Sequence, residues 1–150
     1  LDRSSAASDV YKRQPSAGLD RGVLAILVDS YRKELLPNGD TRIVLDIAPH
    51  LAPFKAAVVP LAKNNVDIVQ KGKQIHSQLQ QLGLGRIRYE DTGNVGKAYR
   101  RNDEIGTPIC ITVDFDTLSD NMVTVRDRNS MQQERILISK LPDIIRSFFN

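Results

Sequence analysis

The fold of this chain is decided between residues 56 and 114, which have the sequence AAVVPLAKNNVDIVQKGKQIHSQLQQLGLGRIRYEDTGNVGKAYRRNDEIGTPICITVD. The first seven residues form an apolar run that is typical of a buried strand, and Pro60 is expected at its end because proline cannot donate to a sheet. Apolar or small residues then recur at spacings of 4, 3, 4 and 3 from Ile68 to Leu82. This spacing predicts a helix, and Gly83 is expected to end it.

The same alternation of strands and helices continues to the end of the chain. We expect a strand over 86–91, a helix over 95–105, strands over 108–114, 122–128 and 134–140, and a final helix that has Pro142 in its first turn. The order β-α-β-α-β-β-β-α predicts an α/β fold, a three-layer α/β/α domain with a mixed sheet.

The residues before this domain divide into two parts. Residues 1–14 (LDRSSAASDVYKRQ) have no hydrophobic period, so we interpret them as a non-native, adapter-like leader. A turn, a helix, a breaker and a strand are then predicted at 15–21, 22–36, 37–40 and 41–47. Because Pro49 and Pro53 bracket a linker, we place a remnant of another domain at 15–47 and the compact domain at 54–150.

The composition excludes several classes of protein. Hydrophobic residues make up 41% and charged residues 26% of the chain, which is typical of a globular protein. No apolar run approaches the ~18 residues of a membrane span, so no membrane partner is expected. The single cysteine excludes an intrachain disulfide and a Cys-cluster zinc site. A net charge of +3 allows an acidic partner such as RNA without requiring one.

A glycine-rich stretch, GNVGK (93–97), precedes the second predicted helix of the domain. The free N–H groups at a helix N-terminus attract anions. A nucleotide-hydrolysing phosphate loop, however, has four residues between its glycines and a serine or threonine after its lysine. Here two residues intervene and Ala98 follows Lys97. We therefore predict an N-cap turn in which Asn94 is the cap.

The helix predicted at 95–105 carries charges of both signs on one face, formed by Lys97, Arg100, Arg101 and Glu104. A solvated surface is the default interpretation of such a face. Asp103 and Glu104, however, lie in the last turn, where the helix dipole disfavours carboxylates. Departures from local rules are often found at functional sites, so this helix is a candidate site.

Other reactive side chains give weaker signals. Asp114, Asp116 and Asp120 form a candidate cation site, but aspartate is common where a strand enters a turn, so we do not predict a metal site. Cys110 lies within an apolar strand and is expected to be a buried small hydrophobe. Neither histidine has a serine or cysteine partner in the sequence, so we predict no catalytic triad and no catalytic residue.

Three segments together resemble one family. PSAGLDR (15–21) resembles the end of motif 3 of class II aminoacyl-tRNA synthetases, and LAPFKAAVVPLA (51–62) resembles the entry to a class IIa anticodon-binding domain. DTGNVGKAYRRNDEIGTPICITVDFDTL (91–118) and TVRDRNSMQQER (124–135) are similar to glycyl-tRNA synthetases of the homodimeric type. The resemblance covers residues 15–149. It implies an anticodon-binding domain with a five-stranded mixed sheet, preceded by a remnant of a class II catalytic domain.

The resemblance also implies roles for the motif 3 segment. The ATP-binding residues would be Gly18, Leu19, Asp20 and Arg21, with Arg21 on the phosphates because a forked guanidinium suits them. The glycine-binding residues would be Pro15, Ser16, Ala17 and Gly18, with Ser16 as the polar contact. Gln14 stands where the family has a glutamate that helps to hold the substrate amino group. Motifs 1 and 2 are absent, so the fragment alone is expected to be inactive and to bind no cofactor.

For the parent protein, the resemblance implies a cytoplasmic, homodimeric ligase that uses ATP with magnesium to attach glycine to its tRNA. The fragment would mainly recognise the anticodon, since glycine anticodons share two cytosines. Carboxylates accept from the cytosine amino group, and arginines bind base oxygens or phosphates. The predicted anticodon contacts are Asn94, Lys97, Arg100, Arg101, Asp103, Glu104, Arg126 and Arg128.

Two other interpretations stay open at this point. One is a non-catalytic anticodon-type nucleic-acid-binding module, similar to the accessory subunit of DNA polymerase gamma. The other is a small-molecule-binding α/β domain. Arg21 favours the ligase, because a non-catalytic relative does not need an arginine for ATP.

Overall fold

The computed structural model describes residues 18–148 and confirms the expected α/β class. A five-stranded mixed sheet with the strand order β4-β3-β5-β6-β7 forms its centre. The strands of this sheet are β3 (Ala56–Pro60), β4 (Ile87–Tyr89), β5 (Ile109–Val113), β6 (Met122–Asp127) and β7 (Gln133–Leu137). The α-helices are α2 (Leu19–Ser30), α3 (Val66–Gln81), α4 (Val95–Glu104), α5 (Thr117–Asp120) and α6 (Leu141–Ser147), and the short 3-10 helices are η2 (Pro49–Leu51) and η3 (Ile138–Lys140). The expected leader lies outside the described residues.

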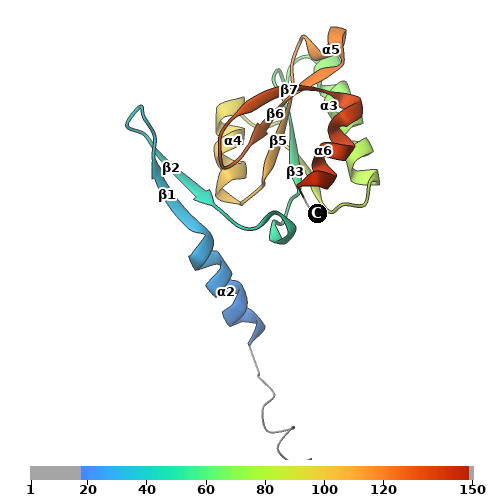
Figure 1. Cartoon of the computed structure of the whole chain (residues 1–150). Coiled ribbons are helices and arrows are strands. Elements are labelled where there is room, and N and C mark those ends of the chain that lie inside the picture. Colours follow the sequence, from blue (N-terminus) through green and yellow to red (C-terminus); the bar gives the residue numbers. More distant parts are fainter. Residues whose placement is uncertain (1–17, 149–150) are drawn as a thin grey trace, which may run out of the picture.

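The sheet is covered by helices on both faces. Strand β3 pairs in parallel with β4 and with β5, whereas β5 with β6 and β6 with β7 are antiparallel pairs. Figure 1 shows α3 and α6 on one side of the sheet and α4 on the other. The predicted stripe on α3 forms the core, because Ile68, Ile75 and Leu79 pack against buried residues of the sheet and of α6 such as Ile111 and Leu141. The expected three-layer arrangement is confirmed.

The sequence-based helix at 22–36 is wrong in its second half. Helix α2 ends at Ser30, and the next residues form strand β1 (Tyr31–Leu35), which pairs antiparallel with β2 (Thr41–Leu45). The sequence-based prediction gave the strand at 41–47 no partner strand. A strand must satisfy its backbone N–H and C=O groups, and the turn at Gly39, with φ of +84°, folds the preceding residues back to do so.

The β1–β2 hairpin packs on the compact domain through one face of β2, whereas β1 stays largely exposed. Val44 is 1% and Ile47 7% exposed. Gly106, which follows α4 with φ of +79°, permits this approach, because a Cβ there would lie 2.6 Å from Cγ2 of Ile47. The hairpin and the domain therefore share buried surface, although the boundary placed between residues 47 and 54 stays a prediction.

Candidate functional site

Helix α4 begins with the predicted cap. The side chain of Asn94 accepts a hydrogen bond from the backbone N–H of Lys97 at 2.9 Å, and Gly93 before it has φ of +81°. The N-cap turn is therefore confirmed. It leaves the side chain of Lys97 exposed beside a helix N-terminus, where the dipole favours an anion.

The outer surface of α4 continues with Arg100 and Glu104, which are both exposed. Nη2 of Arg100 lies 3.3 Å from Oδ2 of Asp40 at the tip of the hairpin, and the two side chains are 58% and 56% exposed. An ion pair that is so exposed contributes little to stability, because water screens it. Arg100 can therefore exchange this carboxylate for an incoming phosphate or base oxygen at small cost.

Arg101, on the flank of α4, faces strand β4. Its Nη2 lies 3.0 Å from Oε1 of Glu90, which is 3% exposed, and it also donates to the backbone carbonyl of Thr92. Nη2 of Arg88 reaches the other carboxylate oxygen of Glu90 at 2.6 Å. Burial alone would raise the pKa of Glu90, but the hydrogen bond from Thr92 and the charges of the two arginines outweigh it and lower the pKa. Glu90 is thus an ionised anchor between α4 and β4.

Asp103 faces inward, although it lies in the last turn of α4. It is 1% exposed and receives two hydrogen bonds from Arg126 of β6, at 2.9 and 3.0 Å. Nε of Arg42 on β2 lies 3.3 Å from its Oδ2. The guanidinium of Arg126 also stacks 4.8 Å from the ring centroid of Tyr99. The unfavourable position of this carboxylate at a helix C-terminus is therefore balanced by two buried guanidinium groups.

Arg128 is also buried, at 3% exposure, between the hairpin and the end of α4. It donates to the backbone carbonyls of Gly106 and Ile47 and forms an ion pair with Asp46 at 3.0 Å. Arg42 in turn donates to the backbone carbonyl of Arg128. These contacts fasten the hairpin to the domain through charged hydrogen bonds.

The predicted anticodon contacts therefore separate into two groups. The exposed or half-buried group surrounds the outer surface of α4 and consists of Asn94, Lys97, Arg100, Arg101 and Glu104. Asp103, Arg126 and Arg128 are instead buried. Asp103 pairs with Arg126, and Arg128 binds Asp46 and two backbone carbonyls, so these side chains hold α4 and the hairpin in place and present no charge to a ligand. A sequence signal for this was present, because an arginine inside an apolar strand needs a buried carboxylate partner.

The described part of the predicted motif 3 segment, residues 18–21, lies at the start of α2, away from α4 (Figure 1). Gly18 precedes α2, and Leu19, Asp20 and Arg21 lie in its first turn, all exposed. Among residues 18–148, no carboxylate forms a salt bridge with Arg21. The predicted glycine-binding residues 15–17 lie outside the described part of the chain. The ATP and glycine contacts thus stay predictions.

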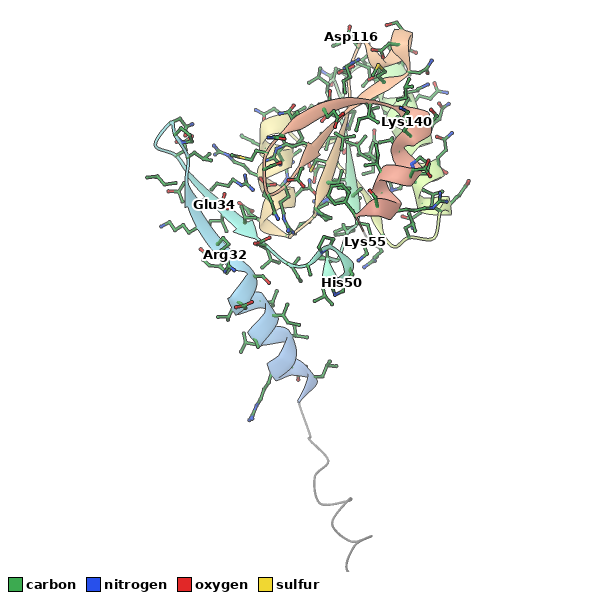
Figure 2. The ribbon with its side chains drawn as sticks, in the orientation of Figure 1. Arg32, Glu34, His50, Lys55, Asp116 and Lys140 are labelled. Atoms are coloured by element: carbon green, nitrogen blue, oxygen red, sulfur yellow. The ribbon has the colours of Figure 1, made fainter. Side chains whose placement is uncertain are left out.

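The aspartates after β5 are bound by an arginine. Nη1 of Arg135 lies 2.6 Å from Asp114, and its Nη2 lies 2.9 Å from Asp120. The described residues include no group of three or more His, Cys, Asp or Glu side chains that could hold a metal ion. Among residues 18–148, no salt bridge joins Asp116 to Arg135, and Asp116 lies at the end of the domain farthest from α2 (Figure 2). Arg135 thus occupies the centre of the candidate cation site.

This arginine predicts a specific pH dependence of stability. Hydrogen bonds from Arg135 lower the pKa of Asp114 to about 2 from an ordinary value of 3.8. Because the folded pKa is depressed, the contribution is complete above pH 4 and disappears as the pH falls toward 2. We expect Asp114→Asn to cost about 2 kcal/mol at pH 6, and this difference from the unsubstituted chain should shrink by pH 3. Urea unfolding across this range measures it. The matched control, Asp116→Asn, should cost little at any pH, and equal pH profiles for the two variants would refute the assignment.

Cys110 is confirmed as a buried hydrophobe. It is 1% exposed in the middle of β5, and burial raises the pKa of its thiol to about 12. The thiol is therefore protonated and unreactive at neutral pH. His76 also has a structural role, because its Nε2 lies within hydrogen-bond distance, 3.1 Å, of the backbone carbonyl of Ile87.

Comparison with known proteins agrees with this geometry. The family model described as "Anticodon binding domain" matches residues 55–148, which include the whole five-stranded sheet and α4. The chain belongs to the anticodon-binding domain family. The anticodon-binding domain is thus the part of the chain that carries the charged α4 surface. None of the helices described is long and apolar enough to cross a membrane.

Several relatives named glycine--tRNA ligase are similar over most of the chain. The protein of Deinococcus radiodurans is 56% identical over 137 residues, which cover 85% of this chain and 27% of that protein. The protein of Thermus thermophilus is 50% identical over 145 residues, or 91% of this chain and 29% of that protein. The protein of Clostridium acetobutylicum is 51% identical over 131 residues, or 87% and 27%. The chain thus spans less than a third of the length of these relatives.

Proposed function

We propose that this chain is the C-terminal part of a glycine–tRNA ligase, a class II aminoacyl-tRNA synthetase, and that its own task is to recognise the tRNA anticodon. The observation that carries the proposal is the coincidence of the family match at 55–148 with the exposed mixed-charge surface of α4. The relatives at 50–56% identity support glycine as the amino acid of the parent enzyme.

The rest of the parent enzyme enters the proposal through the same similarity. We place residues 15–47 in a class II catalytic domain, with Arg21 on the ATP phosphates and residues 15–18 at the glycine pocket. The reaction would use ATP with magnesium, glycine and glycine tRNA, in a cytoplasmic homodimer. The exposure of the first turn of α2 agrees with this role, because a phosphate-binding guanidinium must be accessible to its ligand.

On α4 the proposal assigns different tasks to the two signs of charge. Lys97, Arg100 and Arg101 would bind phosphates or base oxygens of the anticodon loop, with Asn94 at the helix start. Glu104 would accept from the amino group of a cytosine, which uracil lacks. Single-stranded loop bases present these edges to a protein, so a small helix surface is sufficient to distinguish them.

The test is binding of the chain to a stem-loop with the anticodon arm of a glycine tRNA, compared with stem-loops in which uracil replaces one anticodon cytosine. We expect the unsubstituted chain to prefer cytosine, and Glu104→Gln to reduce that preference by about 1 kcal/mol at one position, near the lower end for a base-edge contact. The salt dependence should not change, because a carboxylate on a base releases no counterion.

The matched control is Glu134→Gln, which removes an exposed carboxylate from β7 at the far edge of the sheet. It should leave the preference for cytosine intact. An unsubstituted chain that binds cytosine and uracil stem-loops equally would overturn anticodon recognition by this domain.

A further inference from the structure

A second basic surface lies beside α4, on the edge strand of the sheet. Strand β4 pairs with β3 alone in the five-stranded sheet, so its other edge is open. Its side chains alternate, and Tyr89 faces α3, where its ring contacts the position of Gly72. Arg88 therefore points to the other face, toward α4, and Arg86, two residues earlier, shares that side.

Both arginines contact the ring of Phe54. The guanidinium carbon of Arg86 lies 5.8 Å from the centroid of its ring, and that of Arg88 lies 5.7 Å from it. A phenyl ring attracts a cation to its face, so the ring orients both groups. The ring also holds two positive charges near each other at the surface, and a bound anion would reduce the repulsion between them.

The carboxylates nearby neutralise only part of this cluster. The single carboxylate of Glu90 pairs with both Arg88 and Arg101. Asp91, the next acidic residue, is exposed. Among residues 18–148, no carboxylate lies within salt-bridge distance of Arg86, which is exposed. Arg86 is therefore a positioned guanidinium that lacks an anionic partner.

We infer that Phe54, Arg86, Arg88 and Arg101, which we call the β4 patch, bind the phosphate backbone of the RNA stem next to the anticodon loop. Arg101 belongs both to this patch and to α4, so the two surfaces are continuous. Forked guanidinium groups match phosphate oxygens, and both arginines already cover Phe54, which leaves the ring poorly placed to stack on a base. The patch therefore adds affinity and orientation to the phosphate contacts of α4, whereas the choice of base rests on α4 alone. This inference rests on the proposed function.

The experiment uses Arg86→Gln in the 150-residue chain, with the glycine anticodon stem-loop across a salt series. We expect binding to weaken about 5–10-fold, as for one lost charge-assisted contact, and the log–log salt slope to fall by about 0.9, the value for one duplex phosphate. The ratio of affinities for cytosine and uracil stem-loops should stay the same, because phosphates carry no sequence information. Arg86→Lys should recover the salt slope and only part of the affinity.

The matched control is Arg146→Gln on α6, a half-exposed arginine on the opposite side of the sheet, which removes the same charge. If Arg86→Gln and Arg146→Gln bind the stem-loop equally well and with equal slopes, the β4 patch does not contact RNA. Weakened binding of Arg86→Gln to anionic phospholipid vesicles, with unchanged binding to RNA, would assign the patch to a membrane surface and overturn the inference. If the unsubstituted chain fails to bind the stem-loop at all, the anticodon assignment itself fails.

Discussion

Replacing Asp103 with alanine should lower the free energy of unfolding by about 3–5 kcal/mol, the usual cost of removing one partner from a buried ion pair. The reason is that Asp103 is the carboxylate between Arg126 and Arg42, and all three side chains are 6% exposed or less. Its loss leaves Arg126 buried without a counter-charge, and leaves Arg42 only the half-exposed carboxylate of Glu34 at 3.7 Å. Urea unfolding at neutral pH, followed by circular dichroism, measures the change.

Two further variants make this result specific. Asp143→Ala removes a carboxylate that is 81% exposed and pairs with Arg146, so it should cost less than about 1 kcal/mol. The double variant Asp103→Ala with Arg126→Met should be more stable than Asp103→Ala alone, because it removes one of the stranded charges and keeps much of the volume. A cost below 1 kcal/mol for Asp103→Ala would show that water reaches this network.

The variant with both Arg100→Ala and Arg101→Ala should bind the glycine anticodon stem-loop about 2–4 kcal/mol more weakly, at about 1–2 kcal/mol for each charged contact. With a net charge of +3 for the whole chain, general attraction to RNA is weak, so this local pair must supply much of the phosphate affinity. Two lost phosphate contacts should also make the log–log salt dependence shallower by about 1.4 for single-stranded RNA.

The two arginines should not contribute in the same way. Arg100 gives up only an exposed pair with Asp40, whereas Arg101 also holds Glu90 and Thr92, so its removal disturbs the start of α4. The control removes Lys140 and Arg146, two basic residues at α6, and so matches the change in charge. If both double variants bind with the affinity and salt slope of the unsubstituted chain, the surface of α4 is only solvated charge.

The sequence by itself determined the order of the five sheet strands and of α3, α4 and α6 in the anticodon-binding domain, but not the short helix α5. The helical stripe from Ile68 to Leu79 and the apolar run at Ile109–Val113 appear in the structure as α3 and β5, with those residues buried. Asn94 and Gly83 also acted as the predicted start and end of helices. These signals are local, because hydrophobic period and capping depend on residues within a few positions of one another.

Only the tertiary structure decided which charges are available to a ligand. Arg101 and Asp103 are two residues apart on one helix, yet the first borders the surface and the second is buried against Arg126, 23 residues later in the chain. Tertiary structure also decided the strand at Tyr31–Leu35, which pairs with β2, and β2 in turn packs on α4. Pairing between distant residues is set by the meeting of whole elements, and no local period encodes it. The sequence therefore predicted Asp103 as a ligand contact, whereas the structure pairs it with the buried Arg126 and Arg42.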